Sequence, residues 1–226
     1  MIANDPGIHH NRNMNVVPAQ APVLLQMRAP PLILASASKV RAAVLRGAGL
    51  EFRVQPAMVD EAEFKTAARA DGADATAVAA GLAALKATRL SHREPAALVI
   101  GADQMLSCDG DWLDKPPGLA EARGQLLRLR GRTHMLHCAA CVARDGAVIW
   151  RRAETARLTM RDFSEEFLDV YLAAAGDAVC ASVGAYQLEG LGAHLFARID
   201  GDYFTILGLP LLPLLDFLRQ HRLLAA

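Results

Sequence analysis

The sequence predicts an α/β fold with an elongated mixed sheet and flanking helices, and two patterns along the chain support the mixed sheet. In the first half, short apolar runs typical of buried strands alternate with helical segments, which favours parallel pairing. In the second half, extended segments meet at Asp-Gly turns, which favours antiparallel hairpins. With 226 residues, 53% of them hydrophobic and 21% charged, the chain suits one globular domain with a sizeable core.

The first half of the chain supplies three predicted strands and two predicted helices. The apolar run 32–35 predicts a buried strand, and the Ala-, Leu- and Arg-rich segment after it predicts a helix that ends near residues 47–49. Residues 51–58 suggest a second strand that leads into an acidic loop, and residues 76–91 predict a long helix. Residues 96–100 predict another buried strand, with polar side chains just past its end.

Two Asp-Gly turns organise the next part of the chain. Asp109 and the glycine after it predict a hairpin turn whose return arm reaches Lys115. Asp145 and its following glycine predict a second turn, which joins the extended segments 133–144 and 147–157. These segments extend the predicted sheet with antiparallel strands.

Further helices are predicted at 119–129 and at 164–175, the latter with a serine as N-cap. The chain from Gly184 is rich in loops until a last helix starts near Pro210. Residues 207–218 form the most apolar stretch, but Pro and Asp interrupt it and it is too short to cross a bilayer. We therefore expect no membrane partner.

Charge and cysteine content exclude several classes of protein. Lys plus Arg and Asp plus Glu are 24 each, so the formal charge is zero and no global basic field attracts nucleic acid or an anionic membrane. Four cysteines without a secretory leader predict free thiols in a cytoplasmic protein. Residues 1–30 are rich in Asn, Gln, Pro and His without a period, which predicts a flexible extension before a single domain at 31–226.

The segment after the first strand is the first candidate site. Ser36, Ser38 and Arg41 lie between a predicted strand and the start of a helix, where backbone N–H groups and the helix dipole favour an anion such as phosphate. The alternative is an ordinary serine N-cap with a solvated arginine, and local chemistry does not separate the two.

Acidic residues supply the second candidate site. Asp103 follows the predicted strand 96–100, where open α/β sheets place ligands, and could orient water or hold Mg²⁺. Glu61, beside Asp60, could complete a magnesium site with Asp103, and the first hairpin would return Lys115 to the same end. The alternatives are an Asp that caps a turn, a solubilising acidic loop and a solvated lysine.

A His and Cys cluster at His134, His137, Cys138 and Cys141 resembles a zinc or redox motif. The two cysteines are three residues apart in a predicted strand, which places them on opposite faces and favours a buried core over a metal site or thiol chemistry. The Arg-rich region 123–132 lacks interleaved aromatic residues, which favours a solvated face over a nucleic-acid groove.

Taken together, these residues resemble the Maf family of nucleotide pyrophosphatases. The likeness covers about residues 31–222, in nine short blocks that keep their order and spacing. The blocks are Leu32-Ile-Leu-Ala-Ser-Ala-Ser38 with Arg41, Val59-Asp60-Glu61, Leu85-Lys86-Ala87, Ile100-Gly-Ala-Asp-Gln104, Asp114-Lys115-Pro116, Gly131-Arg-Thr-His134, Val183-Gly-Ala-Tyr-Gln-Leu-Glu-Gly-Leu-Gly192, Arg198-Ile-Asp-Gly-Asp202 and Leu207-Gly-Leu-Pro210.

The resemblance implies two lobes around a deep central cleft, as in inosine-triphosphate pyrophosphatases, and suggests a homodimer. It implies hydrolysis of a nucleoside triphosphate to the monophosphate and pyrophosphate with a divalent cation, Mg²⁺ or Mn²⁺. Asp103 matches the family's proton acceptor, and Asp103 and Glu61 would hold the metal. Lys115 and Glu61 would join Asp103 in catalysis. The residues that match the phosphate-binding block and cluster are Ser36, Ser38, Arg41, Lys86 and Lys115.

Three positions bear on the choice of base. Gln104 and Glu189 are similar to the branch of the family that prefers 7-methyl-GTP, and a carboxylate can accept hydrogen bonds from the guanine edge. Val40 departs from both branches, which have Trp or Arg there, and Lys39 replaces a Pro. The resemblance implies a 7-methyl-GTP preference. A dTTP/UTP-type enzyme and a non-catalytic nucleotide-binding regulator of cell division are the alternatives.

Overall fold

The computed structural model describes residues 25–27 and 29–225. Most of the predicted N-terminal extension, residues 1–24 and 28, therefore lies outside the described residues. Among the described helices, none combines the length and apolarity needed to cross a membrane.

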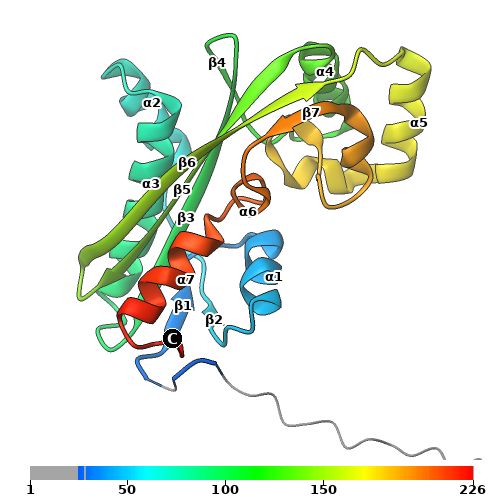
Figure 1. Ribbon diagram of the computed structural model, residues 1–226. Helices are drawn as coiled ribbons and strands as arrows, with labels where there is room; N and C mark the ends of the chain where they lie inside the picture. The colour runs from blue at the N-terminus through cyan, green and yellow to red at the C-terminus, as the bar shows by residue number, and fades with distance from the viewer. Residues whose placement is uncertain (1–24, 28, 226) are drawn as a thin grey trace, which may run out of the picture.

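A seven-stranded mixed sheet forms the centre of the molecule (Figure 1), in the order β2-β1-β3-β5-β6-β7, with β4 beside β3. β1 pairs in parallel with β2 and β3, and the remaining described pairs of strands are antiparallel. The predicted mixed sheet is confirmed. The strands are β1 (Leu32–Leu34), β2 (Arg53–Val54), β3 (Leu98–Cys108), β4 (Asp111–Leu113), β5 (Thr133–Arg144), β6 (Ala147–Met160) and β7 (Phe196–Asp200).

Helices cover the two faces of the sheet, and short 3₁₀ turns follow the fifth helix. The α-helices are α1 (Lys39–Gly47), α2 (Glu61–Ala70), α3 (Ala75–Ser91), α4 (Leu119–Leu129), α5 (Glu165–Ala175), α6 (Tyr203–Ile206) and α7 (Leu211–Gln220). The 3₁₀ turns are η1 (Gly176–Ala181), η2 (Val183–Ala185) and η3 (Leu191–Leu195).

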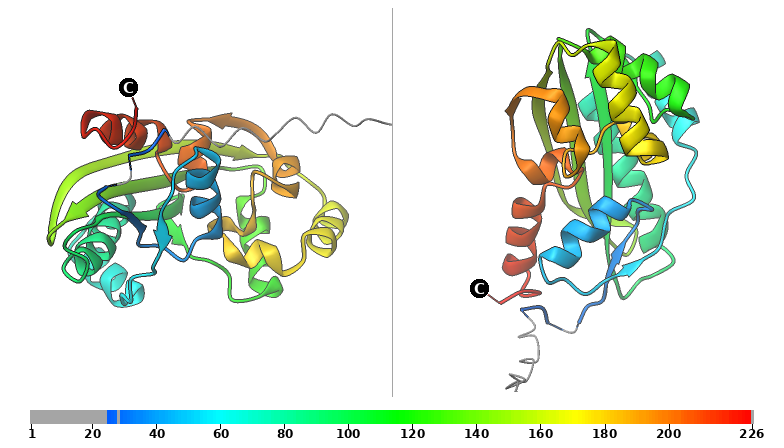
Figure 2. Two further views of the ribbon diagram at one scale, coloured as in Figure 1. Left: turned by 90° about the horizontal axis from the view of Figure 1, so that it is seen from below. Right: turned by 90° about the vertical axis from the view of Figure 1, so that its right-hand side faces the viewer.

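Alternating side chains of β3 assign each face to its own helices. Val99 and Met105 pack into the cluster beneath α3, whereas Ile100 and Ala102 pack into the cluster that α1 and α7 cover. This alternation is the two-residue period of a strand buried on both faces. Figure 2 shows α3 and α7 on opposite sides of the sheet.

The long strands β3, β5 and β6 run through two lobes (Figure 1). One lobe carries β1, β2, α1 and α7, and the other carries α4, α5, the 3₁₀ turns and β7. Separate hydrophobic clusters fill the two ends, and the predicted two-lobed α/β architecture is therefore observed.

A gap in the sheet lies where the lobes meet. β3 pairs with β1 as far as Ile100 and with β4 only from Leu106 onward, while β5 pairs along its other side throughout. Residues 101–105 therefore have a strand neighbour on one side only, and we call this stretch the sheet gap. Its open edge leaves room for a ligand beside a strand that stays firmly held.

The sheet gap corrects one prediction. The strand expected at 96–100 is β3, which has 11 residues and extends to Cys108. Asp103 and Gln104 therefore lie inside β3 and not past its end. The apolar run stops at Ile100 because the parallel neighbour β1 stops there, but pairing with β5 carries the strand on through polar residues.

Three other elements differ from expectation. The strand expected at 51–58 is reduced to the two residues of β2, and β7 lies in the part predicted to be loops. The acidic residues after β2 begin α2 instead of a loop, because the Asp60 side chain accepts a hydrogen bond from the Glu63 backbone N–H at 2.9 Å. No residue of α2 is buried, and its one large apolar side chain is Phe64.

The two Asp-Gly turns are confirmed. Asp109 has φ 52° and Gly110 has φ 86°, and Asp145 and Gly146 have 50° and 79°. Two consecutive residues with positive φ define the turn that matches the twist of antiparallel strands, and the Asp-Gly pair tolerates it. The helix at 119–129 and the start of the last helix near Pro210 also agree with prediction.

Candidate functional site

A cleft of about 630 Å³ lies beside the sheet gap. Residues of β3, α1, α2 and α3 line it from one lobe, and the turns around η2 close it from the other. All ten residues that the sequence singled out for substrate, catalysis or metal line this cleft: Ser36, Ser38, Val40, Arg41, Glu61, Lys86, Asp103, Gln104, Lys115 and Glu189.

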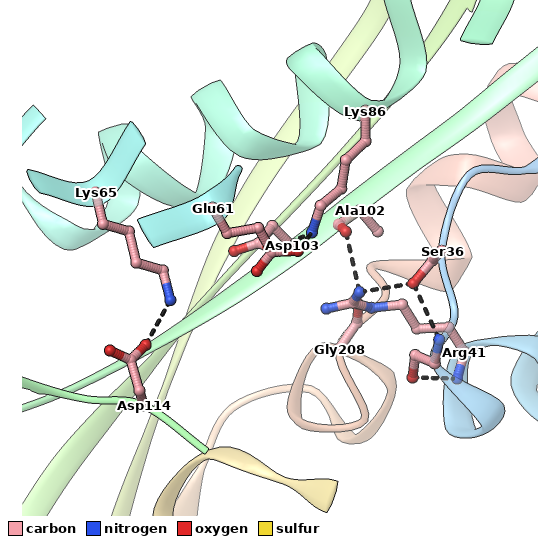
Figure 3. Close-up of polar contacts among 10 residues, drawn as sticks. Ser36, Arg41, Glu61, Lys65, Lys86, Ala102, Asp103, Asp114 and Gly208 are labelled. Atoms are coloured by element: carbon pink, nitrogen blue, oxygen red, sulfur yellow. Dashed lines mark hydrogen bonds and ion pairs between the residues drawn. The ribbon is translucent and has the colours of Figure 1, made fainter. Parts of the chain in front are cut away.

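Two carboxylates and a lysine meet at the centre of the cleft (Figure 3). The Lys86 Nζ lies 2.6 Å from Asp103 Oδ1 and 2.7 Å from Glu61 Oε1. Lys86 and Asp103 are 7% and 5% exposed, whereas Glu61 is open to solvent. A buried lysine beside a buried carboxylate offsets the cost of removing both groups from water, and Glu61 adds a second carboxylate from the exposed side.

Close packing of α3 on β3 sets the distance between Lys86 and Asp103. A Cβ at Gly101 would lie 2.1 Å from the backbone oxygen of Ala83, so only glycine fits there. The helix thereby approaches the strand closely enough for Lys86, one turn after Ala83, to reach Asp103. Glu61 arrives from a different direction, as the first residue of α2.

The charges of the cleft shift two pKa values. Partial burial would raise the pKa of Glu61, but the hydrogen bond and charge of Lys86, with the charges of Lys65 and Lys115, outweigh it and hold that pKa below its usual value. Partial burial, and then the positive charge of Arg41, lowers the pKa of Lys115. The cleft therefore holds an ionised Glu61 and a lysine that releases its proton more easily than a solvated one.

For the Ser36–Arg41 segment, the sequence left open an anion site and an ordinary serine N-cap with a solvated arginine, and the structure has features of both. Ser38 is the N-cap of α1, with its Oγ accepting from the Arg41 backbone N–H at 3.3 Å. The Arg41 side chain is not solvated: its Nε donates to Gly208 O at 2.7 Å, and its Nη1 donates to Ser36 Oγ and Ala102 O, both at 3.0 Å. These bonds fix a guanidinium against the open edge of the sheet gap.

The residues linked to base choice lie at one end of the cleft. Val40 and Glu189 also line a neighbouring groove of about 610 Å³, whose walls include the apolar side chains of Val44, Phe204 and Leu207. Gln104 points to the opposite face of β3 from Asp103 and donates from Nε2 to the backbone oxygens of Thr205 and Ile206, at 3.0 and 3.1 Å. Its amide group therefore holds α6 in place.

Sequence reasoning assigned no site role to two charged residues of the cleft. Lys65 of α2 and Asp114, just after β4, both line it and form an ion pair of 2.5 Å. The helical spacing of Lys65, four residues after Glu61, would have identified it had α2 been predicted. For Asp114, the available signal was its position next to Lys115, which was already a candidate site residue.

Three members of the His and Cys cluster are buried in the core, as predicted, whereas His137 is half-buried. Cys138 and Cys141 are buried on opposite faces of β5, and burial raises the pKa of each thiol to about 12. His134 is buried and shares a 2.7 Å hydrogen bond with the hydroxyl of Tyr186, while His137 Nε2 lies 2.8 Å from Ser107 Oγ. Redox chemistry at these thiols is therefore disfavoured.

The donor set for a divalent cation is small but adequate. Within 25–27 and 29–225, no three His, Cys, Asp or Glu side chains gather as a metal site. In nucleotide sites Mg²⁺ takes one or two protein carboxylates and completes its shell with water and phosphate oxygens. Asp103 and Glu61, brought together by Lys86, supply such a pair. They fit a cation that arrives with a triphosphate.

Comparisons with known proteins identify relatives over most of the chain. Residues 31–221 match a family model described as "Maf-like protein". A protein of Paramagnetospirillum magneticum named "Nucleoside triphosphate pyrophosphatase" is 56% identical over 84% of this chain and 97% of its own length. Proteins with the same name from Granulibacter bethesdensis and Nitrobacter winogradskyi are 53% and 54% identical, over 85% and 86% of this chain and 98% and 96% of theirs.

Proposed function

The chain belongs to the Maf-like family, and from this we propose that it hydrolyses a nucleoside triphosphate to the monophosphate and pyrophosphate. The observation that carries the proposal is the meeting of Asp103, Glu61 and Lys86 in a cleft that Arg41 and Lys115 also line. Relatives at about half identity or above bear the name of this activity over nearly their whole length.

Hydrolysis requires an oriented water and a stabilised leaving group. We assign Asp103 as the base: it takes a proton from water as the water oxygen forms a bond to the α-phosphorus. The bond from that phosphorus to the bridging oxygen breaks, and the electron pair leaves with pyrophosphate. Lys86 fixes one oxygen of Asp103, which orients the other toward the water.

Cations of the chain offset the charge of the triphosphate. Lys115 and Arg41 contact phosphate oxygens, and Ser36 and Ser38 place hydroxyls and backbone N–H groups at the start of α1 for the same purpose. Asp103 and Glu61 would hold Mg²⁺ or Mn²⁺, which when bound withdraws charge from the phosphates and polarises the bond that breaks.

The base preference that we propose is 7-methyl-GTP. Glu189 offers a carboxylate to the donor edge of guanine and to a cationic methylated ring, and the apolar groove beside it suits a flat base. Because the Gln104 amide nitrogen already has two backbone partners, Glu189 is the stronger determinant. The alternative is a dTTP/UTP-type preference, which a substrate panel distinguishes.

The test measures pyrophosphate release from 7-methyl-GTP, GTP, UTP and dTTP with Mg²⁺ or Mn²⁺. We expect the first to be hydrolysed fastest, and Asp103→Asn and Lys115→Ala each to lower kcat/KM about 10²–10⁴-fold without loss of fold by circular dichroism. Unchanged rates in both variants would refute the site. Tight triphosphate binding without turnover under any metal condition would instead favour a non-catalytic regulator.

The same proposal includes the setting in which the enzyme acts. Buried thiols with raised pKa suit a reducing cytoplasm, and the family resemblance suggests a homodimer. Light scattering of the purified protein gives the mass in solution, and a monomer at all concentrations would contradict the dimer.

A further inference from the structure

Cations of the cleft are not equally available to a substrate. Arg41 already donates to three oxygens of the chain, and Lys86 is neutralised by Asp103 and Glu61. Lys65 differs, because its one carboxylate partner, Asp114, is 66% exposed at the side chain, whereas Lys65 itself is 20% exposed. Exposed ion pairs are weak, so an anion with more charge can displace Asp114.

The position of Lys65 makes such an exchange possible. It lies one helical turn after Glu61 on α2, and its side chain points into the same cleft. Figure 3 shows the Lys65–Asp114 pair and the Arg41 cluster on opposite sides of the Glu61, Asp103 and Lys86 group.

A largely apolar groove adjoins the cleft at Val40 and Glu189, which line both. This groove suits a base, and neither Lys65 nor Lys115 lines it. A triphosphate with its base in that groove extends its terminal phosphates past Asp103 toward Lys65 and Lys115. The most negative part of the substrate then meets these two lysines.

We propose that Lys65 forms, with Lys115, the subsite for the two terminal phosphates and for the pyrophosphate product, and that Asp114 is the counter-ion they displace. The inference rests on the proposed function, which supplies the substrate and its direction. When no substrate is bound, the ion pair with Asp114 keeps the Lys65 side chain oriented. After hydrolysis, Asp114 competes with pyrophosphate for Lys65 and so speeds the release of pyrophosphate.

The chain offers a matched control one turn further along α2. Arg69 also bridges α2 to β4, with its Nη2 3.8 Å from Asp111 Oδ1, and its guanidinium lies over the ring of Trp112. Neither Arg69 nor Asp111 lines the cleft. Removal of Arg69 therefore changes the charge of α2 and its link to β4 as removal of Lys65 does, but leaves the proposed subsite intact.

The experiment measures inhibition constants of pyrophosphate and of nucleoside monophosphate for the full-length enzyme. In Lys65→Met we expect the constant for pyrophosphate to rise about tenfold and that for monophosphate to stay unchanged. Lys65→Arg should restore most of the loss, Arg69→Met should leave both constants unchanged, and Asp114→Asn should tighten pyrophosphate binding a few-fold.

The subsite is refuted if pyrophosphate inhibits Lys65→Met and the wild-type protein equally, or if Arg69→Met reproduces the Lys65→Met defect. It is also refuted if monophosphate binding weakens by the same factor, because the effect would then not be local to the terminal phosphates. Calorimetric titration with pyrophosphate gives the same comparison without turnover. Hydrolysis absent in every protein would therefore count against the proposed function, while the titration still decides the subsite.

Discussion

Two polar pairs are buried to the same degree on the central sheet but differ in charge. Lys86 and Asp103, beside the cleft, are 7% and 5% exposed, and His134 and Tyr186, inside the lobe of α4 and α5, are 0% and 4% exposed. The first pair has opposite charges and a second carboxylate, Glu61. The second has no ionic partner, so burial alone lowers the pKa of His134 to about 4.

The difference shows that a nearby opposite charge, and not the depth of burial, decides whether a buried side chain is charged. Desolvation disfavours every charge, and only a nearby opposite charge reverses the balance. A buried ion pair adds little to stability compared with apolar packing, so its presence beside a cleft indicates a use in binding or chemistry. The neutral His134–Tyr186 pair, by contrast, behaves as part of the core.

The largest effect is expected from breaking the charged pair. Lys86→Met leaves two carboxylates facing each other, and we expect the free energy of unfolding to fall by about 4 kcal/mol. Urea denaturation at neutral pH measures it. Replacing both partners, with Lys86→Met and Asp103→Leu together, should recover most of the stability but no activity. A double variant as unstable as the single one would contradict the comparison.

A second prediction concerns the spacing that allows the pair to form. Gly101→Ala places a Cβ 2.1 Å from the Ala83 backbone oxygen, so α3 must move away from β3. We expect a loss of about 3 kcal/mol in unfolding free energy, with a fall in kcat as Lys86 withdraws from Asp103. Gly124→Ala, where a Cβ meets nothing within 4 Å, is the control. Equal behaviour of the two variants would show that the spacing is not critical.

The neutral pair is expected to respond to pH. Because His134 titrates near 4 in the folded protein and near 6.5 when unfolded, the unfolded chain binds more protons as pH falls between these values. Its contribution to stability is present above pH 6.5 and is lost as pH falls toward 4. We expect about 2 kcal/mol less stability at pH 4.5 than at pH 7 from this group.

His134→Gln isolates that contribution from the titration of carboxylates. Denaturation of both proteins at the two pH values gives the difference in slope. A wild-type protein with the same pH dependence as the variant would mean that His134 is protonated in the fold, and the two buried pairs would then not differ as described.

The smallest effect is expected at two helix N-caps, one that lines the cleft and one that does not. Ser38 caps α1 and Ser164 caps α5, each accepting from the backbone N–H three residues on. Alanine at either position should cost about 1 kcal/mol in stability. Only Ser38→Ala should also raise KM, because only Ser38 lines the cleft. A higher KM in Ser164→Ala would show that KM follows stability and not phosphate contact.

Much of the fold was predictable because its local signals are strong. The Asp109 and Asp145 turns, the helix 119–129 and the apolar run of β1 follow from residue preferences that tertiary packing did not oppose. The helix α2 and the strand β7 were missed, since both are short and neither contains a buried residue.

The sequence predicted which residues line the candidate site, but not how their side chains are arranged. Spacing and resemblance selected the ten residues that line the cleft, yet the cleft arises at the sheet gap, which depends on where β1 and β4 stop. No local pattern encodes that Lys86 lies between Asp103 and Glu61, because the contact joins three elements. Lys65 was missed for the same reason, and Asp114 was noted only as part of a matching block and not as a residue of the site.

Arg41 lies 167 residues before Gly208, whose carbonyl holds its guanidinium. During synthesis on a ribosome, the chain therefore cannot complete the Arg41 side of the cleft until residue 208 has left the exit tunnel. A nascent fragment that stops before residue 208 would lack this clamp, however well its first strands had formed. The cleft is thus completed late in translation, with the turn before α7.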